Sequence, residues 1–290
     1  MRSLALPENL VHVAAEEGRA GWLETLPATV QTLEARWSLT VGDPYQPGGS
    51  TAWVAPARHV GGAELVLKLA WPHPEATDEA KGLRAWQGDG AVRLFESCDL
   101  GHTVALLLER CLPGTALGLR AEDDQDVVIA GLLRRLWRHR PASKEFQPLE
   151  AMCARWAARF EARVASGRRP LDPGLCRTGV ALFRALPGSA ERRVLLCTDL
   201  HAGNVLAAQR EPWLMIDPKP YEGDPTYDVL QHLLNCDRRL RTDPHGLVRR
   251  LADLLDVDGE RLLLWLFARC VVESPDWPGL GAVARRIAPP

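Results

Sequence analysis

The sequence predicts an α+β protein with two lobes. Short apolar runs of strand length dominate the first third of the 290 residues, and amphipathic helical stripes dominate the remainder. A Pro-Gly pair follows the last strand of the first part, near residues 109–114. We therefore expect a small N-terminal lobe with an antiparallel sheet over residues 1–110. A larger, mostly helical C-terminal lobe should cover residues 111–290.

The N-terminal lobe should begin with helices and continue as a sheet. Residues 8–37 have a helical pattern that Gly18, Gly21 and Pro27 should break into short pieces. Apolar runs bounded by turn residues then predict strands over 37–41, 52–55, 65–69 and 104–108, with a helix over 75–87.

The C-terminal lobe should be built on helices with two short strands between them. Apolar residues at helical spacing predict helices over 122–138, 148–164 and 173–186, strands over 194–196 and 213–216, and further helices from Tyr227 onward. Such stripes are more typical of core faces than of binding sites.

Composition argues against several classes of protein. The net charge of −2 gives no basic surface for nucleic acid, and no run of 18 apolar residues could span a membrane. Pro7 interrupts the N-terminal segment, which lacks the apolar stretch of a signal peptide. The seven cysteines are scattered and form no CxxC pair, which argues against a disulfide framework or structural zinc. We expect free thiols and a cytoplasmic location.

The strongest chemical signal is residues 197–206, which read Cys-Thr-Asp-Leu-His-Ala-Gly-Asn-Val-Leu, followed by Asp217 after an apolar strand. Phosphoryl transfer needs a carboxylate near the acceptor hydroxyl and oxygen ligands for magnesium. Asp199, Asn204 and Asp217 supply both kinds of group. The alternative is that Asp199 and Asn204 only cap a turn, as these residue types often do.

Residues 199–206 with the downstream Ile216-Asp217-Pro218 resemble the catalytic segment of aminoglycoside phosphotransferases, distant relatives of protein kinases. The resemblance spans residues 37–235 and is closest to the streptomycin 6-phosphotransferase and hydroxyurea phosphotransferase subgroup. Three further segments support that subgroup: residues 79–94, 108–110 and 223–228. The resemblance implies a protein-kinase-like fold, ATP and Mg²⁺ as cofactors, Asp199 as catalytic base, and Asn204 and Asp217 as magnesium ligands.

Lys68 lies in the predicted strand 65–69, and Glu79 lies in the helix that follows. The resemblance implies that Lys68 binds the α- and β-phosphates and pairs with Glu79. The residues alone leave other interpretations open: Lys68 at a solvent-exposed edge, Glu79 as a solvated helix charge, or Glu75 as the partner.

Two more nucleotide contacts follow from the resemblance. The segment 42–51 takes the place of a kinase glycine loop without its GxGxxG pattern, so a plain hairpin turn explains it equally well. As a phosphate-covering loop, it would use the backbone amides of Gly48, Gly49, Ser50 and Thr51. Backbone groups near Glu109 and Cys111 would meet adenine in a hinge.

One departure from the family pattern concerns the residues before Asp199. Cys197 and Thr198 stand where most members have His-Gly, so we expect retained activity with altered local packing. Cys197 is not expected to act as a nucleophile, because nothing in the sequence orients His201 as its base. We expect Asp228 to be structural, holding the helix that follows the metal loop.

The acceptor should be a small-molecule hydroxyl, with a cationic aminoglycoside as the leading candidate. Acidic residues of the C-terminal helices would then line its pocket, for which we select Asp237, Glu273 and Asp276. The alternatives are a kinase for a sugar, an amino alcohol or hydroxyurea, and a nucleotide-binding pseudokinase that acts as an interaction module. A metal-dependent hydrolase is disfavoured, because the pattern lacks clustered histidines.

Overall fold

The computed structural model describes residues 4–139, 145–167 and 171–290, without the side chains of Pro74 and Glu75. The chain forms two compact units. The N-terminal unit comprises Met1–Gly114 together with Ala207–Pro212, and the C-terminal unit comprises Thr115–Leu206 and Trp213–Pro290. Each unit is described by itself.

The N-terminal unit is built on a five-stranded antiparallel sheet with the order β1-β2-β3-β5-β4. Its strands are β1 (Leu39–Val41), β2 (Ala52–His59), β3 (Glu64–Ala70), β4 (Leu94–Asp99) and β5 (Val104–Glu109). In the central strand β3, Lys68 lies opposite Val54 of β2 on one side and Leu106 of β5 on the other. Lys68 is therefore not at a sheet edge.

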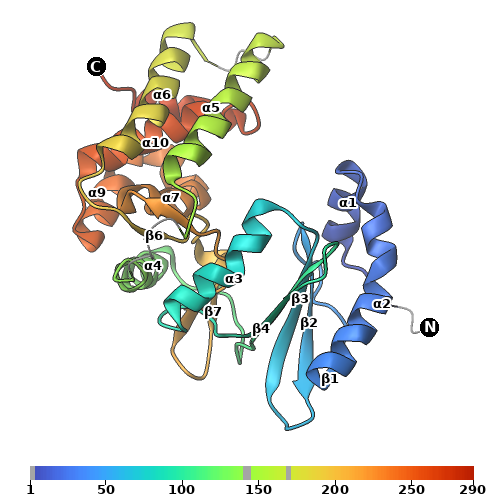
Figure 1. Cartoon of the computed structure of the whole chain (residues 1–290). Coiled ribbons are helices and arrows are strands. Elements are labelled where there is room, and N and C mark those ends of the chain that lie inside the picture. Colours follow the sequence, from blue (N-terminus) through green and yellow to red (C-terminus); the bar gives the residue numbers. More distant parts are fainter. Residues whose placement is uncertain (1–3, 140–144, 168–170) are drawn as a thin grey trace. The chain divides into compact units, whose positions relative to one another are not determined.

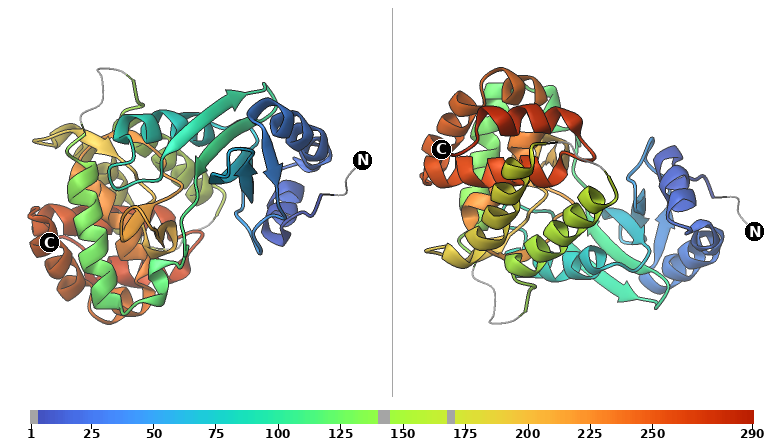
Figure 2. Two further views of the ribbon diagram at one scale, coloured as in Figure 1. Left: turned by 90° about the horizontal axis from the view of Figure 1, so that it is seen from below. Right: turned by 90° about the horizontal axis from the view of Figure 1, so that it is seen from above.

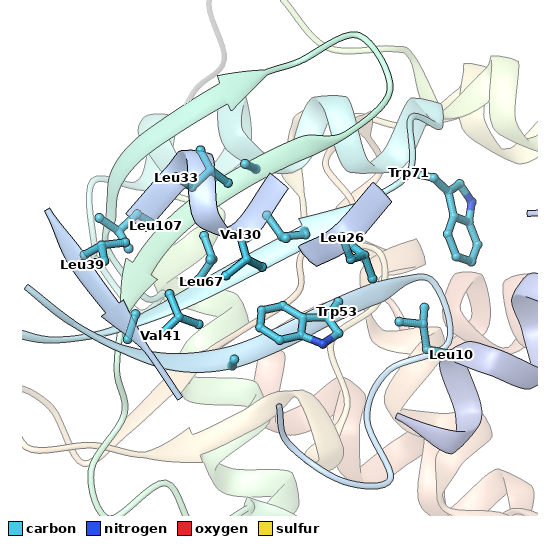
Figure 3. Packing of buried hydrophobic residues seen from close by; sticks show 14 of the residues in the cluster. Leu10, Leu26, Val30, Leu33, Leu39, Val41, Trp53, Leu67, Trp71 and Leu107 are labelled. Carbon is cyan, nitrogen blue, oxygen red and sulfur yellow. The ribbon is translucent and has the colours of Figure 1, made fainter. Parts of the chain in front are cut away.

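Alternate residues of each strand face opposite sides of this sheet. Leu67 of β3 and Trp53 of β2 lie in the main core of the unit (Figure 3). Leu65 and Leu69 of β3 belong to the same core. Ala70 lies on the other face, against Ala76. Figure 1 shows α1 and α2 on the first face and α3 (Pro74–Trp86) on the second. The period of two thus places Lys68 on the α3 face.

The N-terminal helices differ from the prediction. Helix α1 (Glu8–Glu16) ends before Gly18 as expected, but α2 (Ala20–Trp37) runs unbroken through Gly21 and Pro27. A stripe of buried residues explains this: Leu26, Val30 and Leu33 pack on the sheet (Figure 3). Trp22 belongs to the same buried cluster. Burial of four such side chains contributes roughly 1.5–3 kcal/mol each, which offsets the ~3 kcal/mol cost of an interior proline.

Strand β4 was missed because its sequence, Leu-Phe-Glu-Ser-Cys-Asp, mixes apolar and polar residues at the edge of the sheet. Edge strands commonly carry charged residues and lack a clear apolar pattern.

The C-terminal unit is helical, as predicted. Its longer helices are α4 (Glu122–Leu136), α5 (Leu149–Ala165), α6 (Pro173–Ala185), α9 (Pro244–Leu255), α10 (Gly259–Glu273) and α11 (Pro278–Arg286). Two short helices, α7 (Leu230–Asn235) and α8 (Asp237–Thr242), precede α9. Helices α5, α6 and α10 pack together (Figure 2). The aromatic rings of Phe183, Tyr227 and Trp265 contact one another in this unit.

Two small antiparallel sheets complete the C-terminal unit. β6 (Val194–Leu196) pairs with β9 (Tyr221–Gly223), and β7 (Val205–Ala207) pairs with β8 (Trp213–Met215). The sequence predicted β6 and β8 but not their partners. Strands of three residues are too short to show a period, so tertiary pairing decides whether they form.

Across the described ranges of the chain, no helix is both long enough and apolar enough to cross a membrane.

Candidate active site

The predicted catalytic segment is a tight loop between β6 and β7 of the C-terminal unit. Asn204 donates its backbone N–H to the carbonyl of His201, which closes a turn of 3-10 helix over Ala202–Asn204. Ile216 donates its backbone N–H to the carbonyl of Asn204 at 2.9 Å. This bond brings the end of β8, where Asp217 follows, against the catalytic loop. Asp199, Asn204 and Asp217 therefore belong to one local structure.

The side chain of Asn204 holds the proposed base in place. Its Nδ2 donates to the backbone carbonyl of Asp199 at 3.0 Å and lies 3.5 Å from Asp199 Oδ2. The structure thus brings together two residues that the sequence separates by five positions. The residue that caps the 3-10 turn is His201, whose Nδ1 accepts the backbone N–H of Gly203 at 3.1 Å. Burial lowers the pKa of His201, which favours this neutral, accepting form.

The donor set fits a magnesium ion. Because Nδ2 of Asn204 is bound to Asp199, the amide oxygen points to the other side of the side chain. Asp217 adopts a left-handed backbone conformation with φ of 54°, an uncommon state for a non-glycine residue. An amide oxygen and a carboxylate next to one turn are the hard ligands that magnesium prefers.

The side chain of Asp228 holds the backbone at the start of the loop. Its fully buried carboxylate accepts the backbone N–H of Thr198 at 2.6 Å, the backbone N–H of Cys197 at 3.1 Å and the indole N–H of Trp137 at 3.0 Å. These bonds agree with the structural role predicted for Asp228. They also extend it, since Asp228 holds the catalytic loop itself.

The departure at Cys197 and Thr198 has a physical explanation. Thr198 has φ of 45°, a region natural for glycine and strained for a β-branched residue. Its Oγ1 donates to the carbonyl of Lys219 at 2.6 Å, a bond that glycine could not make and that offsets the strain. Cys197 is fully buried, and burial raises the pKa of its thiol well above its ordinary value. A buried thiol of this kind is not a nucleophile.

Lys219 is a site residue that the sequence analysis missed. Its Nζ lies 2.7 Å from Oδ2 of Asp199. The signal was a lysine two residues after Asp217, between Pro218 and Pro220. A lysine in a proline-rich turn usually faces solvent, and nothing in the linear sequence links it to a carboxylate 20 residues earlier.

The predicted pair of Lys68 and Glu79 is present in the N-terminal unit. Lys68 Nζ donates to both carboxylate oxygens of Glu79, at 2.8 and 2.6 Å, and both side chains are nearly buried. Glu79 is thus the partner that the sequence analysis preferred. The side chain of the alternative, Glu75, lies outside the described part of the chain.

The loop over residues 42–51 is held by the N-terminal segment. Asn9 donates its side-chain amide to the carbonyl of Gly48 and its backbone N–H to that of Pro47. A Cβ at Gly48, which has φ of 79°, would lie 2.4 Å from a Pro7 carbon. Glycine is therefore required at position 48 by packing and backbone conformation. A phosphate-binding role for Gly48, Gly49 and Ser50 stays a prediction.

Arg210 fixes the conformation of the predicted hinge segment at Glu109 through hydrogen bonds. The guanidinium of Arg210 donates to both carboxylate oxygens of Glu109, at 2.9 and 2.8 Å, and also to the carbonyls of Gly88 and Ala91. Burial raises the pKa of Glu109, but the bonds from Arg210 and Arg93 leave it lowered overall. The backbone N–H of Glu109 is bonded to the carbonyl of Arg93. A donor to adenine would therefore come from elsewhere in this segment, and Cys111 remains a predicted contact.

The three acidic residues selected for the acceptor do not form one cluster. Glu273 and Asp276 both line a hollow of about 90 Å³ beside Trp156 and Phe160. Glu273 pairs with Arg269 at 2.9 Å, and Asp276 pairs with Arg163. Asp237 is not among the residues of this hollow and pairs with Arg241. Their role toward the acceptor stays a prediction.

The sequence matches the family of aminoglycoside/hydroxyurea antibiotic resistance kinases over residues 36–279. The chain belongs to this family. It is 37% identical to a streptomycin 6-kinase of Streptomyces griseus over 96% of this chain and 92% of the relative. It is also 39% identical to a hydroxyurea phosphotransferase of Kitasatospora aureofaciens over 94% of this chain and 79% of the relative. The kinase and phosphotransferase class predicted from the sequence is confirmed.

Solved structures confirm the protein-kinase-like fold of this kinase. The hygromycin B-bound aminoglycoside phosphotransferase APH(4)-Ia has a TM-score of 0.60 at 14% identity and covers 90% of this chain and 99% of its own. The choline kinase LicA of Streptococcus pneumoniae has a TM-score of 0.61 at 13% identity, covering 91% of this chain and 97% of its own.

Proposed function

We propose that this kinase transfers the γ-phosphoryl group of ATP to the 6-hydroxyl group of streptomycin or of a closely related aminoglycoside. The observation that carries the proposal is the arrangement of Asp199, Asn204 and Asp217 in one loop structure, in a chain 37% identical to a streptomycin 6-kinase over nearly its whole length. A streptomycin-bound phosphotransferase of Streptomyces rimosus, with ADP also bound, has the same fold at a TM-score of 0.55.

In the proposed reaction, Asp199 receives the proton of the acceptor hydroxyl. Asn204 would help to hold Asp199 in place for this step, because the Asn204 Nδ2 donates to the backbone carbonyl of Asp199. Asn204 and Asp217 would hold magnesium, which neutralises charge on the β- and γ-phosphates when bound. ATP as donor is consistent with a cytoplasmic enzyme, in which the buried free cysteines of the chain stay reduced.

Lys68 would bind the α- and β-phosphates. Its ammonium is compact and nearly buried, and Glu79 fixes it on the α3 face of the sheet. In this proposal the N-terminal lobe, residues 1–110, covers the nucleotide. The C-terminal lobe, residues 111–290, carries the catalytic loop and the acceptor site.

Product analysis tests the proposal directly. The protein is incubated with ATP, Mg²⁺ and streptomycin, and mass spectrometry should show the acceptor plus one phosphate. The site of attachment is then read by phosphorus–proton NMR. The Asp199→Asn variant serves as the control for contaminating kinases. Absence of any phosphorylated aminoglycoside from the wild-type reaction would overturn the proposal.

Hydroxyurea is a second candidate acceptor, because the chain is 39% identical to a hydroxyurea phosphotransferase. Parallel reactions with hydroxyurea, streptomycin, a sugar and an amino alcohol separate the acceptors by their kcat/KM values. Binding of Mg²⁺–ATP without transfer to any of these acceptors would instead favour the pseudokinase alternative.

A further inference from the structure

Lys219 occupies a position that the fold builds with three separate contacts. Its backbone N–H donates to the carbonyl of Cys197 at 2.9 Å, and its own carbonyl accepts from Oγ1 of Thr198 at 2.6 Å. Its Nζ lies 2.7 Å from Oδ2 of Asp199. The backbone on both sides of the side chain is thus tied to the two residues that precede the proposed base. The ion pair is a consequence of the loop architecture and not of a chance surface encounter.

Both partners of the pair are partly open to solvent. The side chains of Lys219 and Asp199 are 35% and 15% exposed, so neither is sealed in the core. An ion pair with this exposure contributes little to stability, since solvent screens it. The ion pair contributes little to stability, yet the backbone on both sides of Lys219 is fixed. We take this combination as support for a role of Lys219 in contacting the substrate.

The choice of lysine over arginine at position 219 supports a functional role for this residue. The chain has 35 Lys and Arg residues together, of which only positions 68, 81, 144 and 219 are lysine. Lys68, like Lys219, contacts a carboxylate of the proposed site, that of Glu79. An ammonium is a compact charge on a flexible stem and can change partners by rotation, whereas a guanidinium forms a fixed planar fork.

We propose that Lys219 is a further catalytic residue, which neutralises Asp199 before transfer and binds the oxygens of the γ-phosphoryl group during transfer. This inference rests on the proposed phosphotransferase function. The acceptor oxygen forms a bond to the γ-phosphorus while the bond between that phosphorus and the β–γ bridging oxygen breaks. ADP leaves with the electron pair of the broken bond, and the hydroxyl proton moves to Oδ2 of Asp199.

The proton transfer is what moves the ammonium. While Asp199 is ionised, its carboxylate attracts Lys219 at 2.7 Å. Once Asp199 takes up the proton it is neutral, and the charged phosphoryl oxygens become the stronger partner for the ammonium. Lys219 thereby follows the negative charge from the base to the transferred group, which stabilises the transition state more than the ground state.

Nucleotide affinity and turnover of Lys219 variants test the inference. Lys219→Met removes the charge and nearly preserves the volume, and Lys219→Arg keeps the charge. Lys81→Met is the matched control, because Lys81 also pairs with a carboxylate, that of Asp78 within α3, and its side chain is 42% exposed. Calorimetry measures the affinity of each protein for Mg²⁺–ADP and for a non-hydrolysable Mg²⁺–ATP analogue. Steady-state kinetics with the acceptor give kcat and KM.

We expect Lys219→Met to lose about 10²-fold in kcat, typical of one electrostatic contact to a transition state. Without its ammonium partner, ionised Asp199 would repel the charged γ-phosphoryl group, so affinity for the ATP analogue should fall. Affinity for ADP, which has no γ-phosphoryl group, should stay within about twofold. Lys219→Arg should recover part of both losses, and Lys81→Met should match wild type.

Equal loss of ADP and ATP-analogue affinity in Lys219→Met, or a kcat above half that of wild type, would overturn the inference. The two nucleotide affinities do not depend on the acceptor. They therefore test the role of Lys219 even if the wild-type protein phosphorylates none of the acceptors. That lack of phosphorylation would count against the proposed function, and not against the role of Lys219.

Discussion

The carboxylate of Asp228 accepts the backbone N–H of Thr198 at 2.6 Å, across 30 residues of sequence. Its second oxygen accepts the N–H groups of Cys197 and Trp137. One buried side chain therefore satisfies the polar groups that the turn before Asp199 would otherwise leave unpaired.

Asp228→Asn should destabilise the protein because an amide offers one acceptor oxygen where the carboxylate offers two. The amide N–H₂ group would face a backbone N–H, and a buried donor left without a partner costs about 1–3 kcal/mol. Urea unfolding measures the loss. Asp237→Asn, on an exposed residue of α8, is the control and should change stability by less than about 0.5 kcal/mol. Equal stability of the two variants would contradict the supporting role of Asp228.

Asp199→Asn should abolish turnover and leave nucleotide binding nearly intact. The amide cannot take up the proton of the acceptor hydroxyl, and general-base catalysis contributes about 10²–10⁴-fold to rate. Steady-state kinetics give the loss in kcat, and calorimetry gives the affinity for Mg²⁺–ATP. If the variant keeps more than about half of the normal rate, Asp199 is not the general base.

Asp217→Ala should weaken magnesium-dependent ATP binding more than Asn204→Ala. A carboxylate offers the ion a full charge, whereas an amide oxygen offers a dipole. Calorimetric titrations with ATP, with and without Mg²⁺, separate the metal-dependent part of the affinity. The assignment fails if the larger loss appears at Asn204, or if the two losses are the same.

Lys68 and Glu79 should show coupled effects on catalysis. Lys68→Ala removes a positive charge from the phosphates, and we expect a loss of about 10²-fold in kcat/KM for ATP. Glu79→Ala should lose less, because Lys68 can still reach the phosphates without its partner at 2.6 Å. The double variant should lose less than the sum of the single variants in free energy, since both act through one interaction. Strict additivity in this cycle would show that the pair does not act on ATP.

His232 should make stability depend on pH in the alkaline range. Burial alone would lower its pKa, but the contacts of its ring with Asp126 at 2.9 Å and with Cys236 raise it to about 9 from the ordinary 6.5. Because the folded pKa is the higher one, the stabilisation is fully present below about pH 6.5 and is lost as pH rises through about 9. A shift of this size corresponds to roughly 3 kcal/mol.

Chemical denaturation of wild type and His232→Asn between pH 6 and pH 10 measures this effect. The asparagine cannot be protonated, so its variant should be less stable at pH 6 and should lose less stability as pH rises. Parallel stability curves for the two proteins would show that His232 does not carry the dependence.

The sequence alone determined the class of fold and was enough to select the proposed reacting groups. Helix and strand periods report which side chains are buried locally, so the two-part α+β organisation and the long helices could be predicted. Asp199, Asn204 and Asp217 could be selected because phosphoryl transfer demands carboxylate and amide oxygens, and because the motif that carries them is compact.

Tertiary structure decided what depends on contacts between distant residues. Helix α2 continues through Pro27 because its buried face packs on the sheet, and the three-residue strands β7 and β9 form because partners pair with them. The same holds at the site, where the contacts of Lys219 with Asp199 and of Asp228 with Thr198 join segments that flank the paired strands β6 and β9. Local propensity carries no information on such contacts, because their free energy arises from residues that the chain brings together only on folding.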